Sequence, residues 1–273
     1  MTIIGNYNLL EEIGEGTFGK VFKAQHKRTK SMVAVKIQHR EHSLILKHEA
    51  KIYKYLNDIS GVPLMRNYGV DSGFSYMVLD LLQPLTVMEI CKRDCINYMV
   101  SALTIIGEVH KRDIIHRDIK PDNFLVKTAD NGISSLYLID FGLSKLYRNE
   151  AKKHIEERRD KKLVGTANYV SLNVHNGIEA SRRDDIESIC YTFISIYEKE
   201  LPWSQLSDTY TTEEEKLELY SKIKEMKQSM VDWLHDLPGE FLTLLLYSRK
   251  LGFTEEPNYK YLCSLMNNLL LIQ

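Results

Sequence analysis

The chain has 273 residues, of which 44% are hydrophobic and 27% charged, and its formal net charge is -1 at pH 7. This composition is typical of a soluble globular protein, and the length fits one large domain or two lobes around a cleft. The near-zero charge excludes a strongly basic protein that binds nucleic acid over its whole surface. Because the sequence has no run of about 18 apolar residues and no charged-then-apolar leader, we expect neither a transmembrane helix nor a signal peptide.

Short strands are expected over residues 7–38, where alternating or β-branched stretches are broken by glycine and polar residues. A helix is predicted over 41–57 from its apolar spacing. Two more strands, 61–70 and 74–80, flank Asp71-Ser72-Gly73, which is typical of a tight turn.

Helical patterns dominate from Asp94 onward, and Asp94 itself is the expected N-cap of a helix that reaches about residue 112. Further helices are expected over 185–198, 213–228, 239–251 and 257–270. The sequence therefore predicts an α+β fold, with a small strand-rich lobe containing one main helix before a larger helical lobe. The seam between them is expected near residues 81–85. The four cysteines, Cys91, Cys95, Cys190 and Cys263, form no C-x-x-C pair, so we expect free thiols in a reducing compartment.

A G-x-G-x-x-G pattern is formed by Gly14, Gly16 and Gly19. Alone it is a weak signal that a chance glycine turn could produce. A dinucleotide-binding βαβ unit would need a helix directly after Gly19, but the residues that follow predict a strand, a turn and a second strand. A glycine hairpin that covers phosphate groups fits better, because glycine lets backbone N–H groups approach phosphate oxygens.

Lys36 lies in an alternating strand, and Glu49 lies on the apolar stripe of the following helix. Each would be costly to bury alone, so we expect them to form an ion pair. Such a pair could hold the α- and β-phosphates of a nucleotide. An ordinary structural ion pair remains the alternative.

Polar residues at 118, 120 and 123 stand in HRDIKPDNF, on backbone that proline keeps out of regular structure. Asp118 could accept a proton from an attacking hydroxyl, and Lys120 could neutralise a transferred phosphoryl group. Asn123, and Asp140 after the apolar stretch 136–139, could bind Mg²⁺ through oxygen. Each residue alone could serve in a turn, but together they supply what phosphoryl transfer needs.

The ordered set of residues resembles the signature of eukaryotic protein kinases. Its members are Gly14, Gly16, Gly19, Lys36, Glu49, His116, Arg117, Asp118, Asn123, Asp140, Phe141 and Gly142. Lys120, two residues after Asp118, resembles Ser/Thr rather than Tyr kinases. The segments HRDIKPDNFL, LIDFGLSKLYR, GTANYVSLNVHNGIEASRRDDIES and LPW are similar to the casein kinase I family. That family has Ser-Ile-Asn where other kinases have Ala-Pro-Glu, and Ser171-Leu172-Asn173 stands there in this chain.

The resemblance implies a bilobal kinase fold in one domain over 1–273, with the N-lobe over about 1–80, the hinge at 80–85 and the C-lobe over 86–273. It also implies ATP and Mg²⁺ as cofactors. The phosphate-covering segment would comprise Ile13, Gly14, Glu15, Gly16, Thr17, Phe18, Gly19, Lys20 and Val21. Leu79 would be the gatekeeper residue, and Asp80 to Leu82 would bind adenine through the backbone. Asp185 would anchor the catalytic loop, and it is also a candidate helix N-cap.

The sequence departs from this family where phosphate-primed substrates are recognised. Asn168 stands where the family has an arginine, and Lys227 is our best match for a further phosphate-binding lysine. Three glutamates at 213–215 replace a basic cluster, whereas residues 151–162 still carry six basic and three acidic residues. We therefore expect a weakened preference for primed substrates and some attraction for acidic ones. Thr166 is the main candidate for regulatory phosphorylation.

We expect an active Ser/Thr kinase with protein substrates, acting as a monomer in the cytoplasm, the nucleus or both, with no direct nucleic-acid or membrane partner. Family members act in DNA repair, membrane traffic and developmental signalling, and the sequence does not choose among these. A pseudokinase scaffold would lack a catalytic residue, and none is missing. A small-molecule kinase would have no evident need for the basic segment 151–162.

Overall fold

The computed structural model describes residues 2–16, 19–129, 132, 134–206, 210–229 and 234–272. The chain divides into two compact units. The first comprises residues 1–84 and 125–142, and the second comprises residues 85–124 and 143–273. The first break thus falls within the seam expected from the sequence, and the chain returns to the first unit for residues 125–142.

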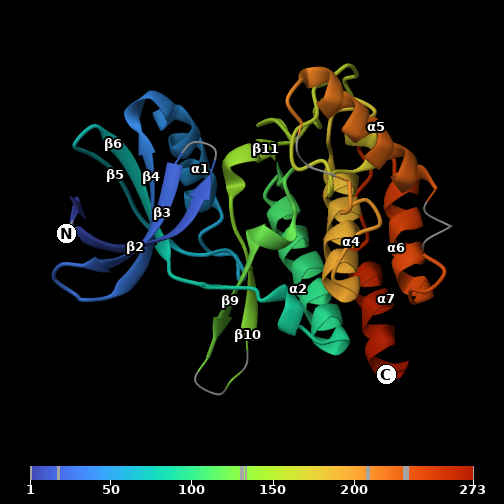
Figure 1. The fold of residues 1–273 in the computed structure, drawn as a ribbon, viewed down its shortest axis with the longest axis horizontal. Helices are drawn as coiled ribbons and strands as arrows, with labels where there is room; N and C mark the ends of the chain where they lie inside the picture. The colour runs from blue at the N-terminus through green and yellow to red at the C-terminus, as the bar shows by residue number, and fades with distance from the viewer. Residues whose placement is uncertain are drawn as a thin grey trace. The chain divides into compact units, whose positions relative to one another are not determined.

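The first unit contains a six-stranded antiparallel sheet with strand order β1-β2-β3-β4-β6-β5 (Figure 1). Its strands are β1 (Ile3–Ile4), β2 (Tyr7–Gly16), β3 (Gly19–His26), β4 (Met32–His39), β5 (Met65–Asp71) and β6 (Phe74–Asp80). A 3₁₀ turn (Arg40–His42) leads into helix α1 (Ser43–Tyr55), which lies against β4, β5 and β6. The strands and the helix predicted from the sequence are present.

Strand alternation in β4 places side chains in the core of this sheet. Val33 and Val35 are buried and pack with Ala24 of β3 and Val78 of β6. The turn between β5 and β6 consists of Ser72 and Gly73, whose φ angles are 48° and 84°. Two consecutive positive φ angles are those of a two-residue hairpin turn, which explains the predicted Asp-Ser-Gly turn.

A second, three-stranded sheet in the first unit has the order β10-β9-β7. It is formed by β7 (Gln83–Pro84), β9 (Phe124–Thr128) and β10 (Ser134–Leu138). The backbone N–H of Leu138 donates to the carbonyl of Gly61 at 2.8 Å, which holds the end of β10 against the α1–β5 connection. This contact fixes the strand that leads directly to Asp140.

The second unit is helical. Its helices are α2 (Lys92–Lys111), α3 (Leu172–His175), α4 (Arg182–Glu198), α5 (Glu213–Gln228), α6 (Gly239–Lys250) and α7 (Tyr259–Ile272). Helix α4 packs against α2 and α6, and α7 packs against α2 and α6 (Figure 1). Strands β8 (Ile114–Ile115) and β11 (Lys145–Leu146) form a small antiparallel sheet. In the chain as a whole, 3₁₀ turns also occupy Val87–Glu89, Pro121–Asn123 and Phe141–Leu143.

Two helix N-caps differ from the candidates that the sequence offered. Helix α2 begins at Lys92, and its N-cap is Cys91, whose Sγ accepts from the backbone N–H of Asp94 at 3.4 Å. Asp94 therefore lies in the first turn, where its charge favours the helix N-terminus, and the N-cap prediction was wrong. Helix α4 begins after Ser181, so Asp185 also lies inside the first turn rather than at the cap.

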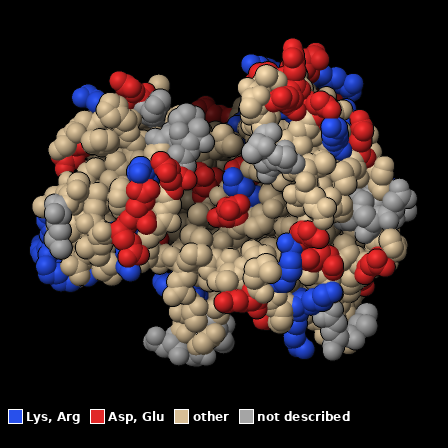
Figure 2. Space-filling view, in the orientation of Figure 1, with Lys and Arg blue, Asp and Glu red and all other residues tan. Residues whose placement is uncertain are grey.

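The surface carries interspersed acidic and basic side chains (Figure 2). Acidic side chains gather over the start of α5, where Glu213, Glu214 and Glu215 occupy the first turn. Within the described ranges, no helix combines the length and the hydropathy that a membrane span requires.

Candidate active site

The glycine pattern forms the end of a β-hairpin. Gly16 pairs with Gly19, and Glu15 with Lys20, in the register of β2 and β3. Strand β4 follows β3 with no helix between them, which excludes the dinucleotide-binding βαβ unit. Thr17 and Phe18, which the sequence assigns to the same segment, lie outside the described residues.

Gly19 is required by a close approach of two strands. A Cβ added there would lie 2.2 Å from the carbonyl oxygen of Ile37 on β4, so a larger residue would push the strands apart. On the same hairpin, Lys20 pairs with Glu12 at 2.9 Å, while Ile13 is exposed and Val21 lies opposite Gly14.

Lys36 and Glu49 form the ion pair predicted from the sequence. Lys36 Nζ lies 2.8 Å from Glu49 Oε2 and 3.0 Å from Oε1, and the Glu49 side chain is only 1% exposed. Lys36 Nζ also lies 3.2 Å from Oδ1 of Asp140, a contact that the sequence did not predict. One ammonium thus lies between two carboxylates, one buried on α1 and one 43% exposed after β10.

Burial and charge compete in this trio. Burial raises the pKa of Glu49 to about 7, against the opposing effect of the Lys36 ammonium. Burial alone would lower the pKa of Lys36, but the carboxylates of Glu49 and Asp140 outweigh it and leave that pKa raised. Lys36 is therefore held in its charged form, and its charge opposes the burial that favours the neutral form of Glu49.

Asp140 adopts a backbone conformation that is uncommon for a non-glycine residue, with φ at 62°. Its backbone N–H donates to the hydroxyl of Tyr53 at 2.9 Å, and its Oδ1 lies 3.4 Å from the backbone nitrogen of Gly142. Tyr53 is a buried residue of α1 that also packs edge-on against Phe141, with ring centroids 5.2 Å apart. Helix α1 thus positions Asp140 through Tyr53. The sequence indicated only that Tyr53 belongs to the apolar face of this helix, and did not predict the contact with Asp140.

The expected adenine-binding residues lie at the end of β6. Asp80 is the last residue of that strand, pairs with Val33, and receives Arg66 Nε at 2.6 Å on Oδ1. Leu82 is buried just before β7. Leu79, the expected gatekeeper, pairs with Ala34. The adenine-binding and gatekeeper assignments stay predictions.

Asp185 anchors the predicted catalytic loop in the second unit. Its Oδ2 accepts from the backbone N–H of His116 at 2.7 Å, and its Oδ1 accepts from that of Arg117 at 2.9 Å. His110 Nε2 lies 2.9 Å from Asp185 Oδ2. Burial would raise the pKa of the Asp185 carboxyl, but its hydrogen bonds, led by the one to His110, leave it lowered. These contacts hold Arg117 at a φ of 70°, immediately before Asp118.

Asp118, Lys120 and Asn123 converge with one residue that the sequence did not assign to catalysis. Asp118 Oδ1 accepts from the Thr166 hydroxyl at 2.8 Å, and Lys120 Nζ lies 3.2 Å from the same Thr166 oxygen. Lys120 Nζ is also 3.4 Å from Asp118 Oδ2. A Cβ on Gly165 would come within 2.4 Å of the Arg117 carbonyl, so glycine is needed to bring Thr166 this close.

The two predicted metal ligands fit a magnesium ion in their donor chemistry. The side-chain nitrogen of Asn123 donates to the Asp118 carbonyl at 2.8 Å, which leaves the amide oxygen as its metal-binding atom. Asp140 contacts Lys36 through Oδ1, and a carboxylate is likewise an oxygen donor. Among the described residues, no group of three or more His, Cys, Asp and Glu is arranged to hold a metal. Both assignments stay predictions.

Lys227 does not fit the role expected from the sequence. Its side chain is fully buried, and its Nζ donates to the carbonyls of Ala167 and Val170. A buried ammonium that already serves backbone acceptors is not presented to a substrate phosphate, so the match to a phosphate-binding lysine was wrong. Sequence spacing alone could not show which face of α5 would be buried.

A model of the protein kinase domain matches residues 7–263. The match spans nearly the whole chain, and this protein therefore belongs to the protein kinase family. The predicted α+β kinase fold is confirmed. Membership implies the use of ATP and usually of Mg²⁺.

Proposed function

We propose that this kinase is an active Ser/Thr kinase of the casein kinase I type, which transfers the γ-phosphoryl group of ATP to hydroxyls of acidic protein substrates. The contact between Asp118, Thr166 and Lys120 carries the proposal. It joins the proposed base, the proposed phosphate-stabilising lysine and the segment that follows Gly165 in one hydrogen-bonded group. The other residues of the signature are all present.

In the proposed reaction, the Asp118 carboxylate accepts the proton of a substrate Ser or Thr hydroxyl as its oxygen bonds to the γ-phosphorus. The bond between that phosphorus and the β–γ bridging oxygen breaks, and ADP leaves. Lys120 stabilises charge on the phosphoryl oxygens, and Lys36, held by Glu49, binds the α- and β-phosphates. Bound Mg²⁺ would neutralise phosphate charge, with Asn123 and Asp140 as the protein ligands.

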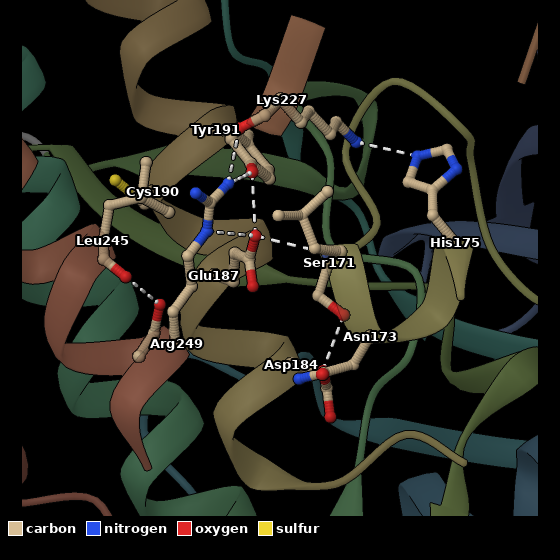
Figure 3. Close-up of polar contacts among 12 residues, drawn as sticks. Ser171, Asn173, His175, Asp184, Glu187, Cys190, Tyr191, Lys227, Leu245 and Arg249 are labelled. Atoms are coloured by element: carbon tan, nitrogen blue, oxygen red, sulfur yellow. Dashed lines mark hydrogen bonds and ion pairs between the residues drawn. The ribbon is translucent and has the colours of Figure 1, made fainter. Parts of the chain in front are cut away.

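The casein kinase I assignment is supported by how the Ser-Leu-Asn triplet is used. The Ser171 hydroxyl donates to Asp184 at 2.6 Å, and the Asn173 side-chain nitrogen donates to the same carboxylate oxygen at 3.1 Å (Figure 3). Two residues of the triplet therefore bind the first aspartate of Arg182-Arg183-Asp184-Asp185. Both segments are among those that resemble the casein kinase I family, and this contact joins them.

Acidic protein substrates are proposed because residues 151–162 retain an excess of basic side chains. We propose that the protein acts as a monomer, in the cytoplasm, the nucleus or both. We propose that neither nucleic acid nor a membrane is a direct partner.

Transfer of label from γ-labelled ATP to dephosphorylated casein tests the proposal, with Asp118→Asn as the matched control. We expect phosphoserine or phosphothreonine with the wild type. We expect loss of at least about a thousandfold in kcat for the variant, with nucleotide affinity nearly unchanged. Nucleotide binding without transfer by the wild type would refute the proposal and identify a pseudokinase.

A further inference from the structure

Lys227 is a fully buried lysine on α5 whose ammonium donates to two backbone carbonyls and lies beside a histidine. Its Nζ lies 2.8 Å from the carbonyl oxygen of Ala167 and 2.7 Å from that of Val170. It also lies 3.2 Å from Nε2 of His175 (Figure 3), which is itself 3.1 Å from the Ala167 carbonyl oxygen. An ammonium group has three N–H donors and no acceptor. The two carbonyls accept from this ammonium, and Nε2 of His175 is a third acceptor in the tautomer that carries its proton on Nδ1.

The partners of Lys227 suit a cation. The rings of Tyr191 and Trp203 lie 4.6 and 5.2 Å from its Nζ, within the range of cation–π contacts. Burial, helped by the charge of Lys227, lowers the pKa of His175 to about 3, so that this imidazole stays neutral and can accept a hydrogen bond. Burial also lowers the pKa of Lys227 itself, which the Glu187 charge opposes and the Arg249 charge reinforces.

An ion pair does not explain this burial. Among the described residues, no carboxylate lies within ion-pair distance of Lys227 Nζ. The nearby carboxylate of Glu187 is engaged elsewhere, with Arg249 Nε at 3.1 Å and the Tyr191 hydroxyl at 2.8 Å (Figure 3). Arg249 also donates to the backbone carbonyl of Lys227 at 2.9 Å, which fixes the helix position that carries the lysine.

The carbonyls that Lys227 binds belong to the segment directly after Thr166. The Thr166 carbonyl accepts from the backbone N–H groups of Tyr169 and Val170 at 2.9 and 3.0 Å. The indole N–H of Trp203 donates to the Asn168 carbonyl at 3.0 Å. Lys227 binds the carbonyls of the residues at 167 and 170, on both sides of Asn168. The backbone carbonyls of this segment therefore accept hydrogen bonds from side chains that lie outside it.

The same segment bears on catalysis at its start, because the Thr166 hydroxyl contacts Asp118. A substrate hydroxyl must approach Asp118 beside this segment if Asp118 is the base. The position of residues 167–170 therefore bears on how an acceptor peptide is placed, and not on how the nucleotide is placed.

We propose that Lys227 is a positioning residue for the acceptor substrate, which acts by fastening residues 167–170 through the Ala167 and Val170 carbonyls. This inference rests on the proposed kinase function. It adds a determinant of substrate binding that lies on α5 and touches neither the nucleotide nor the reacting atoms.

Lys227→Met tests the proposal, because methionine keeps most of the side-chain length and removes the three donors. We expect KM for an acceptor peptide to rise by about tenfold while KM for ATP stays within about twofold. The matched control is Lys222→Met on the exposed part of the same helix, where the lysine pairs only with Glu218 at 2.7 Å. The control should leave both constants unchanged.

Amide hydrogen exchange gives a reading that does not depend on activity. In Lys227→Met the amides of Tyr169 and Val170 should exchange at least about tenfold faster than in the wild type, while those of α2 keep their rates. A folded variant with wild-type exchange in this segment and a wild-type acceptor KM would overturn the proposal. An inactive wild type would refute the proposed function instead, and the exchange rates would still decide whether Lys227 holds the segment.

A second pair of variants covers the case in which Lys227→Met does not fold. His175 is only partly buried, and His175→Phe removes one acceptor from Lys227, while His175→Gln can keep it through its amide oxygen. We expect His175→Phe to raise the acceptor KM and His175→Gln to restore it. Equal effects of the two substitutions on acceptor KM would contradict a role that runs through Lys227.

Discussion

The hydroxyl of Thr166 donates a hydrogen bond to Oδ1 of Asp118 across 2.8 Å, and the same oxygen of Thr166 lies 3.2 Å from Lys120 Nζ. Thr166 is also the main candidate that the sequence offers for regulatory phosphorylation. Because its hydroxyl contacts the carboxylate proposed as the catalytic base, a phosphoryl group there would place negative charge directly against Asp118.

Thr166→Val should therefore lower kcat with the acceptor peptide by about tenfold or more, because valine keeps the shape and loses the donor. Thr166→Ser should retain activity within about threefold. Steady-state kinetics at saturating ATP measure both. Wild-type kcat in Thr166→Val would show that the hydrogen bond plays no part in turnover.

The Lys36–Glu49 pair predicts a defect in nucleotide binding. Lys36→Met should raise KM for ATP by about tenfold or more, and Glu49→Gln should have a smaller effect, since its amide oxygen can still accept from the lysine. Lys23→Met is the control, because Lys23 lies on the neighbouring strand and only pairs loosely with Glu11 at 3.8 Å. Titration of a fluorescent ATP analogue checks the result, and unchanged affinity in Lys36→Met would leave the pair a purely structural one.

Asn168 predicts a weak preference for phosphate-primed peptides. We expect kcat/KM for a primed peptide to be within about threefold of that for its unprimed twin in the wild type, and to rise by about tenfold relative to the twin in Asn168→Arg. Asn168→Gln, which adds length without charge, should change nothing. The Asn168 backbone contact to Trp203 does not depend on the side chain. A strong primed preference in the wild type that arginine does not increase would refute the idea.

His175 predicts a loss of stability in acid. Burial, the charges of Lys227 and Lys224, and the lack of a carboxylate partner leave its folded pKa at about 3, below the ordinary value of 6.5. The unfolded chain therefore takes up the proton first, so this contribution is complete above about pH 6.5 and is lost as pH falls toward 3.

Urea unfolding from pH 7 to pH 4 should thus show a smaller decrease in the free energy of unfolding for His175→Gln than for the wild type. The comparison between the two proteins isolates His175, because other buried groups such as Asp184, whose pKa burial raises to about 6, are common to both. Identical pH slopes would mean that His175 titrates alike in the folded and unfolded chains.

Local pattern was sufficient for much of the fold and for part of the site. The alternating apolar residues around Lys36, and the position of Glu49 on the apolar stripe of 41–57, predicted an ion pair between the two. The structure contains this pair, with a distance of 2.8 Å between Nζ and Oε2. The Asp-Ser-Gly turn and the helix over 213–228 were found where the sequence put them, because turn chemistry and the threonine cap of α5 are local signals.

Contacts between distant segments could not be predicted in the same way. Tyr53 and Asp140 are 87 residues apart, and Lys227 lies 60 residues from Ala167. Nothing in the spacing of α5 shows that a lysine will point inward, since lysines are usually exposed. The Cys91 cap was missed for a related reason, because cysteine is an uncommon cap and Asp94 offered a stronger signal.

Helix α1 carries both Glu49 and Tyr53, which are one turn apart and contact Lys36 and the Asp140 backbone respectively. A displacement of α1 within its unit would stretch both contacts at the same time. The position of α1 thus determines both the lysine proposed to bind phosphate and the aspartate proposed to bind the metal, so a change at one of these residues that moves the helix would also affect the other.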